Sequence, residues 1–274
     1  MKNILRLVTI ALLFAVFACT KKPGNRVEQV NARFDARLAE RAVEHFSSDD
    51  QSLAIAARFL PPSPAILEAG SYHGETALAM VQRWPGATIY SFEPVPELFE
   101  IVKKNTSPWK NIHPSALALS DKVGSAVFHL SAMEGKPDAS LGSGSLLAPS
   151  HHLEEFPWVK FDNTITVTTT TIDQWAGANQ VAKIDFLWLD IQGAEFPVLK
   201  ASPRILKTVK VIMTEVEFVE LYKGQSLYAE MRPWLEARGF EEVATDFATA
   251  APKMADLKNR KGTSWYGNSL FVRK

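Results

Sequence analysis

From Ala65 to the carboxyl terminus, short runs of apolar and β-branched residues alternate with stretches of helical periodicity. This alternation is typical of βαβ units, in which a helix connects two parallel strands and covers one face of their sheet. It predicts an α/β fold with a mostly parallel, doubly wound sheet and helices on both faces. We expect strands at Ala65–Ala69, Thr88–Phe92, Ile112–Ala118, Ala126–Ser131, Thr164–Thr169, Phe186–Asp190, Val209–Glu215, Glu242–Asp246 and Ser269–Arg273. We expect helices at Glu75–Arg83, Val95–Asn105, Ala194–Lys200 and Leu227–Arg238, and a long loop at Gly135–Pro157.

The amino-terminal segment has a different character. Lys2 and Arg6 precede the apolar run LVTIALLFAVFA, which has the length of a signal-peptide core and is too short to span a bilayer as a helix. Cys19, the single cysteine of the chain, follows this run directly. The arrangement resembles a bacterial lipoprotein signal, in which the cysteine becomes the lipid-modified first residue. We therefore predict a signal peptide at 1–18, lipidation at Cys19 and association with a membrane; the alternatives are an uncleaved anchor and, if the signal is unused, a cytoplasmic protein.

Residues 19–64 are predicted to form a linker and two helices, Val27–Phe46 and Gln51–Leu60, in front of a main domain at 65–274. Lys and Arg total 30, as do Asp and Glu, so no overall positive charge favours nucleic acid as a partner. One cysteine excludes an intramolecular disulfide, and no Cys/His cluster has zinc-finger spacing. Packing must therefore stabilise the domain.

The segment ILEAGSYHGETAL contains an apolar strand that ends at Glu68, turns through Gly70 and Gly74, and enters a helix. A strand, a glycine turn and a helix N-terminus together form a cradle of the nucleotide-binding type. A pyrophosphate would need glycine where Tyr72 stands, so a dinucleotide cofactor, and with it an NAD-dependent oxidoreductase, is disfavoured. The acidic Glu68 suits a ligand with an ammonium group. An ordinary tight connection is the alternative.

Two further carboxylates follow predicted strands. Glu93 comes 23 residues after Gly70, close to the offset at which an acidic side chain reaches ribose hydroxyls in this topology. A cap of the following helix is its alternative role. Asp190 ends the strand Phe186–Asp190 and should lie at the crevice where open α/β sheets bind ligands. Its alternative role is to cap the helix that begins at Ala194.

Three blocks in one order carry a family resemblance: ILEAGSYHGET, IYSFEPVPELFEIVKKN and IDFLWLDIQGAEFPVLKAS. They resemble the FkbM-type methyltransferases, over about residues 66–274. The resemblance implies a Rossmann-like class I methyltransferase fold with a seven-stranded sheet, S-adenosylmethionine as methyl donor, and a hydroxyl of a sugar or small metabolite as acceptor. It also implies roles for the candidate residues: Glu68, Gly70 and Gly74 at the methionyl end, Glu93 at the ribose, Ser120 and Asp121 at the adenine, and Asp190 at the methyl-transfer site.

Asp190 is the predicted general base, with His73, His151 and His152 as other candidates. We assign no metal ligand, although Glu195, Glu215 and Glu217 could join Asp190 in an oxygen-rich site of the kind that Mg²⁺ accepts. Trp188 and Gln192 stand where the family often has Lys and Glu, and Trp188 is expected to line the acceptor pocket. The serine-bearing segment Ser140–Leu147 resembles a loop of the family; a flexible linker is the other interpretation.

The leading hypothesis is an S-adenosylmethionine-dependent O-methyltransferase that acts on a small-molecule or saccharide acceptor. The alternative is a non-catalytic, membrane-anchored lipoprotein that uses the Rossmann scaffold to bind a nucleoside or saccharide. The family often has Lys and Glu where this chain has Trp188 and Gln192, and the absence of these charged groups favours the alternative. The complete set of Glu68, Gly70, Gly74, Glu93 and Asp190 favours the enzyme.

Overall fold

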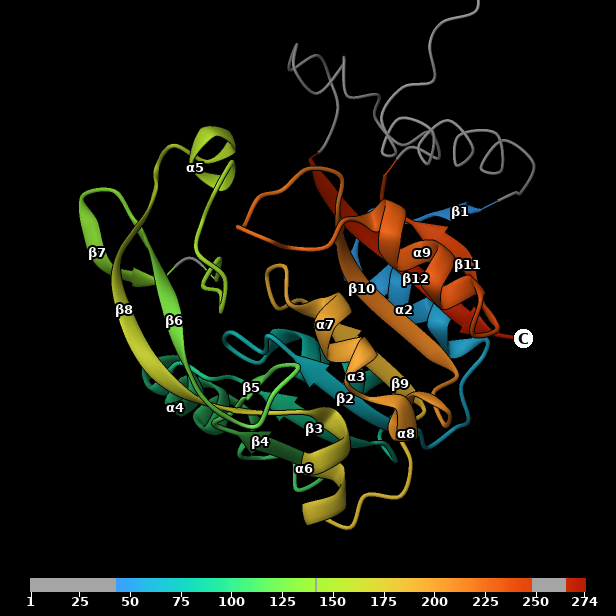
Figure 1. Ribbon diagram of the computed structural model, residues 1–274. Helices are drawn as coiled ribbons and strands as arrows, with labels where there is room; N and C mark the ends of the chain where they lie inside the picture. The colour runs from blue at the N-terminus through green and yellow to red at the C-terminus, as the bar shows by residue number, and fades with distance from the viewer. Residues whose placement is uncertain (1–42, 141, 248–264) are drawn as a thin grey trace, which may run out of the picture.

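A central sheet of eight strands organises the part of the chain that the computed structural model describes, residues 43–140, 142–247 and 265–274 (Figure 1). In spatial order the strands are β1 (Glu44–His45), β11 (Phe240–Thr245), β12 (Tyr266–Arg273), β10 (Val211–Glu217), β9 (Phe186–Leu189), β2 (Ala65–Ala69), β3 (Thr88–Phe92) and β4 (Ile112–Ser115). β12 runs antiparallel to both of its neighbours, and every other pair is parallel. The predicted α/β class is confirmed. The two-residue β1 adds an edge strand to the seven-stranded sheet that the family resemblance implies.

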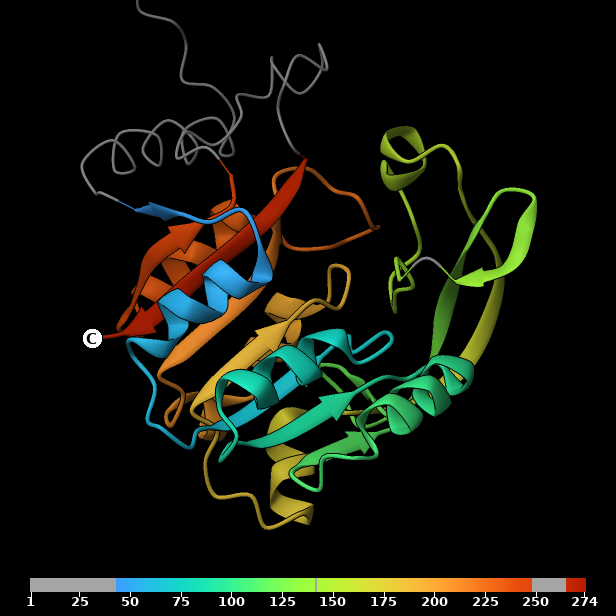
Figure 2. The same cartoon turned by 180° about the vertical axis from the view of Figure 1, so that it is seen from behind.

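Helices cover both faces of this sheet, as the alternating pattern predicts. On one face, α2 (Asp49–Ala57) and α3 (Glu75–Arg83) pack against the sheet, and α4 (Pro96–Thr106) lies on the same side (Figure 2). The opposite face carries four helices: α6 (Ile172–Ala178), α7 (Glu195–Lys200), α8 (Pro203–Leu206) and α9 (Tyr228–Glu236). α6 and α8 are short and were not predicted. Each face has its own hydrophobic core, because strand residues alternate between the two faces.

A second sheet corrects the prediction for the middle of the chain. It has the order β5 (Ala118–Leu119), β8 (Val159–Thr170), β6 (Gly124–Met133), β7 (Lys136–Ser140), and β6 pairs with β8 in antiparallel register. The predicted strands Ala126–Ser131 and Thr164–Thr169 belong to this sheet and not to the parallel one. The predicted strand Ile112–Ala118 is divided between the two sheets, and the predicted loop Gly135–Pro157 contains β7 and α5 (His152–Glu155). Sequence periodicity shows strands but not which strands pair, so it could not separate the sheets.

The amino-terminal predictions are tested only from residue 43 onward. Glu44–His45 is strand and pairs with β11, so the predicted helix Val27–Phe46 is wrong at its carboxyl end. α2 begins two residues before the predicted Gln51, because the Ser48 hydroxyl accepts a hydrogen bond from the Gln51 N–H and caps the helix. The signal peptide 1–18, Cys19 and the rest of that first helix lie outside the described residues, and the domain boundaries stay predictions.

Across the ranges that the structure describes, no helix has both the length and the hydropathy that crossing a bilayer requires.

Candidate active site

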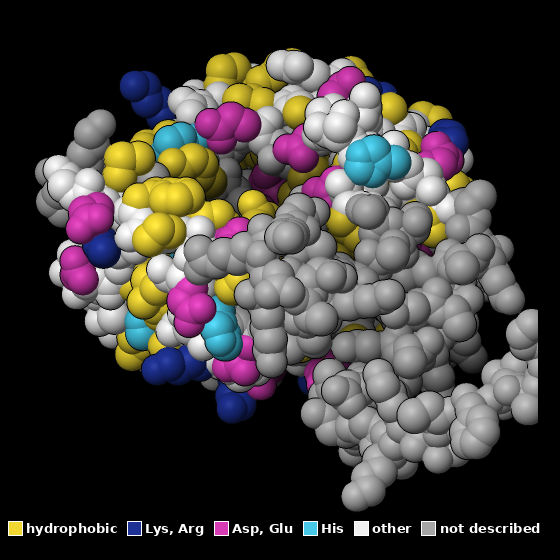
Figure 3. Space-filling view, turned by 90° about the horizontal axis from the view of Figure 1, so that it is seen from above, with side chains coloured by type: hydrophobic (Ala, Val, Ile, Leu, Met, Phe, Trp, Pro, Cys, Tyr) yellow, Lys and Arg dark blue, Asp and Glu magenta, His cyan; other side chains and the backbone are white. Residues whose placement is uncertain are grey.

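A cavity of about 430 Å³ lies at the carboxyl ends of β2, β3 and β9, where the second sheet and the segment after β7 close over them. This is the crevice at which open α/β sheets bind ligands. Seen from above, Asp and Glu side chains gather around the hollow in this face (Figure 3). Three predicted site residues line the cavity: Gly70, Glu93 and Asp190. The other four, Glu68, Gly74, Ser120 and Asp121, stand behind or beside its wall.

The turn between β2 and α3 brings the main chain close to Asp190. Gly70 has a φ of +87°, and a Cβ built on it would lie 1.8 Å from the carbonyl oxygen of Asp190. Only glycine fits there, for both conformation and space. Tyr72 also has a positive φ, +51°, at the position where the dinucleotide pattern has glycine. Gly74, with a φ of +89°, precedes the first residue of α3, so the turn delivers a helix N-terminus toward the cavity.

Glu93 is held at the end of β3 by main-chain donors. The Tyr72 N–H donates to one carboxylate oxygen of Glu93 and the Val95 N–H to the other, each at 2.9 Å. The side chain is buried, and this desolvation raises the pKa of Glu93 to about 7, although the two hydrogen bonds oppose the shift. Each oxygen keeps a lone pair for a hydroxyl donor in the cavity.

Glu68 lies behind the cavity wall and not on it. Its carboxylate is fully buried and accepts hydrogen bonds from the hydroxyls of Ser71 (3.0 Å) and Ser91 (2.6 Å). Burial raises the pKa of Glu68, and the two hydroxyls partly counter that shift. Ser71 does line the cavity, so this serine stands between the Glu68 carboxylate and the cavity.

Ser120 and Asp121 follow β5 and lie beside the cavity. Leu119, the residue before them, lines it, whereas neither of the two does. Ser120 is anchored by its N–H, which donates to the carbonyl of Thr170, and its hydroxyl donates to Asp121 at 3.3 Å.

Asp190 belongs to a hydrogen-bonded network centred on Gln192. The Gln192 side-chain amide donates to Asp190 and to Glu215, both at 2.8 Å, and its oxygen accepts from the Tyr222 hydroxyl at 2.7 Å. Gln192 has a φ of +56°. The hydroxyl of Ser145 donates to its backbone carbonyl at 2.7 Å. One residue therefore ties the end of β9 to β10, to Tyr222 and to the serine-bearing segment.

Asp190 is exposed at the cavity wall, and the protein atoms that surround its carboxylate there desolvate it in part. This desolvation raises the pKa of Asp190, and the hydrogen bond from Gln192 opposes the rise. The alternative role of Asp190 as a cap of α7 is not seen in the structure. Ala194 precedes α7 and provides no side-chain cap, and Glu195 accepts a hydrogen bond from the Ile191 N–H. A raised pKa makes Asp190 a better proton acceptor than an ordinary aspartate.

The other candidate bases are less well placed. His73 stacks on Tyr72 with ring centroids 3.8 Å apart, His151 contacts the carbonyl of Glu220, and neither lines the cavity that holds Asp190. His152 is buried, and desolvation lowers its pKa to about 4, so it is a weak base at neutral pH.

Trp188 does not line the cavity, and the prediction that it does is wrong. It is 7% exposed and packs in the core beneath α2 and α3, where its ring meets that of Phe186 edge to face at 6.3 Å. Trp188 lies within β9 and faces the core beneath α2 and α3, whereas the cavity lies beyond the carboxyl end of the strand. Sharing a strand with Asp190 therefore does not bring Trp188 to the cavity.

A second cavity, of about 310 Å³, adjoins the first and was not expected from the sequence. The two share four residues: Ser143, Gln192, Glu215 and Tyr266. Three of its other lining residues are aromatic: His152, Phe156 and Trp158. Tyr266 lines both cavities, and Tyr222 donates to Gln192 where they meet. Neither tyrosine stands in a recognisable sequence pattern, because only the tertiary fold brings β12 and the segment after β10 to this place.

The sequence profile of the methyltransferase FkbM domain matches residues 68–242. A curated relative, the 2-O-methyltransferase NoeI of Sinorhizobium fredii (strain NBRC 101917 / NGR234), is 35% identical over 200 residues, which are 73% of this chain and 81% of the relative.

Two solved structures are similar in fold. The methyltransferase FkbM from Methylobacillus flagellatus KT has a TM-score of 0.48 and 11% identity, over 88% of this chain and 58% of that one. A TehB-like SAM-dependent methyltransferase from Corynebacterium glutamicum has a TM-score of 0.39 and 12% identity, over 90% and 97%.

The profile covers more than half of the chain, and the curated relative matches most of both sequences. Neither comparison supports the alternative of a non-catalytic binding protein. The chain belongs to the FkbM family of S-adenosylmethionine-dependent methyltransferases.

Proposed function

We propose that this protein transfers the methyl group of S-adenosylmethionine to a hydroxyl of a sugar or another small metabolite. The observation that carries the proposal is the position of Asp190: its carboxylate lines the same cavity as Gly70 and Glu93 and has a raised pKa. The relative named as a 2-O-methyltransferase supports oxygen as the methylated atom.

The residues around the cavity fit this cofactor. At about 430 Å³ the cavity lies within the range of small-molecule and cofactor sites. Gly70 lies on the cavity wall, and the glycine turn after β2 leads into the N-terminus of α3, an arrangement typical of nucleotide cradles. We assign the turn of Gly70 and Gly74, with Glu68 acting through Ser71, to the methionyl end.

The remaining assignments follow the strand order. Glu93 is assigned to the ribose, because its carboxylate keeps acceptor capacity toward the cavity. Ser120 and Asp121 are assigned to the adenine end, since they continue from Leu119 on the cavity wall.

When bound, S-adenosylmethionine supplies a methyl group activated by a positive sulfur. Asp190 takes the proton of the acceptor hydroxyl as the oxygen–carbon bond forms and the sulfur–carbon bond breaks, which leaves a methyl ether and S-adenosylhomocysteine. Gln192 holds the Asp190 carboxylate in place, and the segment around Ser143 helps to exclude water.

We assign the acceptor to the second cavity. Its aromatic wall offers flat apolar faces, and Gln192 and Glu215 offer polar groups where the two cavities meet. Such a mixture recognises a hydroxylated ring, whose C–H face packs on aromatic residues while its hydroxyls find hydrogen-bond partners.

The test begins with calorimetric titration of the full chain with S-adenosylmethionine and S-adenosylhomocysteine. We expect micromolar binding of both, followed by mass spectrometric detection of methylated products from a panel of methyl glycosides and short oligosaccharides. A folded chain that binds neither molecule would refute the cofactor assignment. Binding without any methylated product, from these or from a metabolite extract, would count against an O-methyltransferase acting on this acceptor class.

We also propose that Cys19 is lipid-modified and anchors the protein to a membrane. The apolar run at 7–18 and the position of the only cysteine directly after it support this. Cys19→Ser should release the protein from the membrane fraction. A variant that stays in that fraction would instead indicate an uncleaved anchor.

A further inference from the structure

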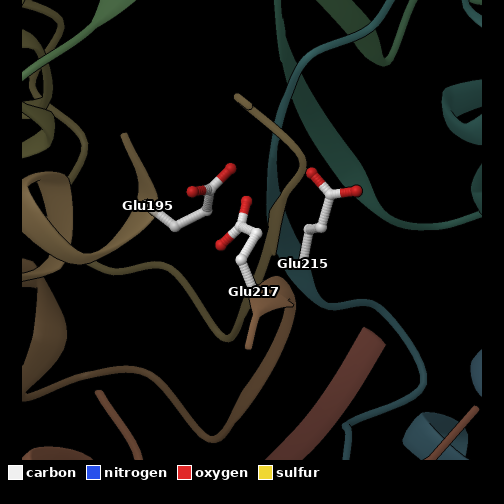
Figure 4. Close-up of side chains that lie close together, drawn as sticks. All are labelled: Glu195, Glu215 and Glu217. Atoms are coloured by element: carbon white, nitrogen blue, oxygen red, sulfur yellow. The ribbon is translucent and has the colours of Figure 1, made fainter. Parts of the chain in front are cut away.

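Three glutamates come together beneath the place where the two cavities meet. One carboxylate oxygen from each of Glu195, Glu215 and Glu217 lies within 4.8 Å of the other two (Figure 4). Glu215 and Glu217 are two residues apart on β10 and therefore point to the same face of the sheet, and Glu195 is the first residue of α7. All three side chains are buried.

Few groups of the protein offset the negative charge of these three carboxylates. No Lys or Arg within the described ranges forms an ion pair with any of the three. Glu195 accepts from the Ile191 N–H at 2.7 Å, and Glu215 accepts from the Gln192 amide at 2.8 Å. These donors carry no net charge. Buried like charges this close repel one another, so the site needs either protons or a cation.

Glu217 adds an independent sign of a missing partner. Its Oε1 atom is fully enclosed and has no partner at hydrogen-bonding geometry among the described residues, although the uncharged side-chain amide of Gln225 lies beside this carboxylate. In Figure 4 the Glu217 carboxylate lies between the other two, so it points into the cluster. A buried acceptor without a partner is destabilising, and folded proteins rarely leave one unsatisfied. A ligand with positive charge would satisfy this oxygen and the repulsion together.

We propose that Glu195, Glu215 and Glu217 bind a divalent cation, and that the site prefers Ca²⁺ to Mg²⁺. Ca²⁺ accepts several carboxylates in a flexible geometry, whereas Mg²⁺ keeps several waters and is usually bound through one or two carboxylates. Three buried carboxylates whose ligand oxygens lie within 4.8 Å of one another therefore suit Ca²⁺ better. Water completes the coordination from the side of Glu215, which lines both cavities.

This site is distinct from the proposed methyl-transfer chemistry and would stand without it. A bound cation would hold α7 against β10, and through Gln192 it would fix the position of the Asp190 carboxylate. Its presence can be read directly as binding, so failure of this inference and failure of the proposed function are distinguishable.

The experiment uses the full chain, stripped with a chelator and dialysed into a slightly alkaline buffer, because protons compete for the same oxygens. Ca²⁺ and Mg²⁺ are titrated separately by calorimetry, and thermal unfolding is followed with and without each ion. We expect one saturable Ca²⁺ site, weaker binding of Mg²⁺, and a higher melting temperature with Ca²⁺.

Glu217→Gln should weaken Ca²⁺ binding about tenfold or more, because it removes one ligand charge without changing the side-chain size. Glu97→Gln makes the same change on the exposed first turn of α4 and serves as the matched control. Glu215→Gln, at the cavity edge, is the second variant if Glu217→Gln does not fold. No saturable Ca²⁺ binding by the folded parent chain, or binding that is equal in Glu217→Gln and the parent, would overturn the proposal and leave shared protons as the balance.

Discussion

The two walls of the main cavity are built in different ways. On the β2–β3 wall, Glu93 receives two main-chain N–H groups and Glu68 receives two serine hydroxyls. On the β9–β10 wall, Asp190 and Glu215 share the side-chain amide of Gln192. On the first wall the Glu93 carboxylate is therefore held by main-chain donors, whereas on the second wall both carboxylates are held by a single side-chain amide.

This difference indicates how the two halves of the site can change. The β2–β3 wall tolerates little variation, since a single Cβ at Gly70 would overlap the main chain of Asp190. The β9–β10 wall can be altered by one substitution, because the single side chain of Gln192 contacts both Asp190 and Glu215. Five substitutions test the comparison.

Gly70→Ala should have the largest effect. The new Cβ would meet the Asp190 carbonyl at 1.8 Å and the alanine would have to adopt a φ of +87°, so we expect a loss of about 4 kcal/mol or more in the free energy of unfolding. Urea denaturation measures this. Gly239→Ala, with a φ of +82° and no atom within 4 Å, isolates the backbone strain and should cost about 1 kcal/mol. Equal losses in the two variants would show that the contact with Asp190 does not matter.

Asp190→Asn should lower the methyl-transfer rate about 10²–10⁴-fold, the usual contribution of a positioned general base. Binding of S-adenosylhomocysteine should change little, because the amide keeps the size and the hydrogen-bonding reach of the carboxylate. Single-turnover kinetics and calorimetry separate the two quantities. A fully active variant would remove Asp190 as the base.

Glu93→Gln should weaken cofactor binding about tenfold, since a charge-assisted hydrogen bond to the ribose becomes a neutral one. The pKa of Glu93 is raised to about 7, so the free carboxyl ionises as the pH rises through that value. Affinity in the parent chain should therefore increase between about pH 6 and 8. The variant should lose this dependence, and a variant that keeps it would show that another group titrates.

The raised pKa of Glu93 also affects the stability of the folded protein. Because burial raises the folded-state pKa of Glu93 above its unfolded value of 4.5, the protonated form favours the folded state. The contribution of Glu93 to stability is present below pH 4.5 and is lost as the pH rises toward 7. Glu93→Gln should reduce this part of the pH dependence of the melting temperature.

Gln192→Glu should shift the acidic limb of the pH–rate profile to higher pH. The substitution removes the donor 2.8 Å from Asp190 and Glu215 and places a further negative charge there, which raises the pKa of Asp190. Gln174→Glu, on the exposed side of α6, is the control. An unchanged profile would mean that Gln192 does not set the ionisation of the base.

Asp121→Ala should have the smallest effect, about threefold or less on cofactor affinity, because Asp121 stands beside the cavity and not on its wall. Calorimetry with S-adenosylhomocysteine measures this. A tenfold loss would show that Asp121 reaches the adenine directly when the cofactor is bound.

The sequence alone determined the elements whose signals are local. The alternation after Ala65 predicts the parallel strands and their helices, and β2, α3 and β3 match the predicted bounds. Glycine and carboxylate positions at strand ends predict the cavity wall at Gly70, Glu93 and Asp190, because parallel strands bring their carboxyl ends to one edge of the sheet.

Only the tertiary structure decided which strands pair and which side chains meet. The separate β6–β8 sheet, the burial of Trp188 and the bridge from Gln192 to Tyr222 depend on contacts between distant segments. Periodicity reports the face of a strand but not which strand is its neighbour, nor which residues reach the cavity at the carboxyl end of the sheet. The gathering of Glu195 with Glu215 and Glu217 has the same origin, because it depends on how α7 packs beside β10.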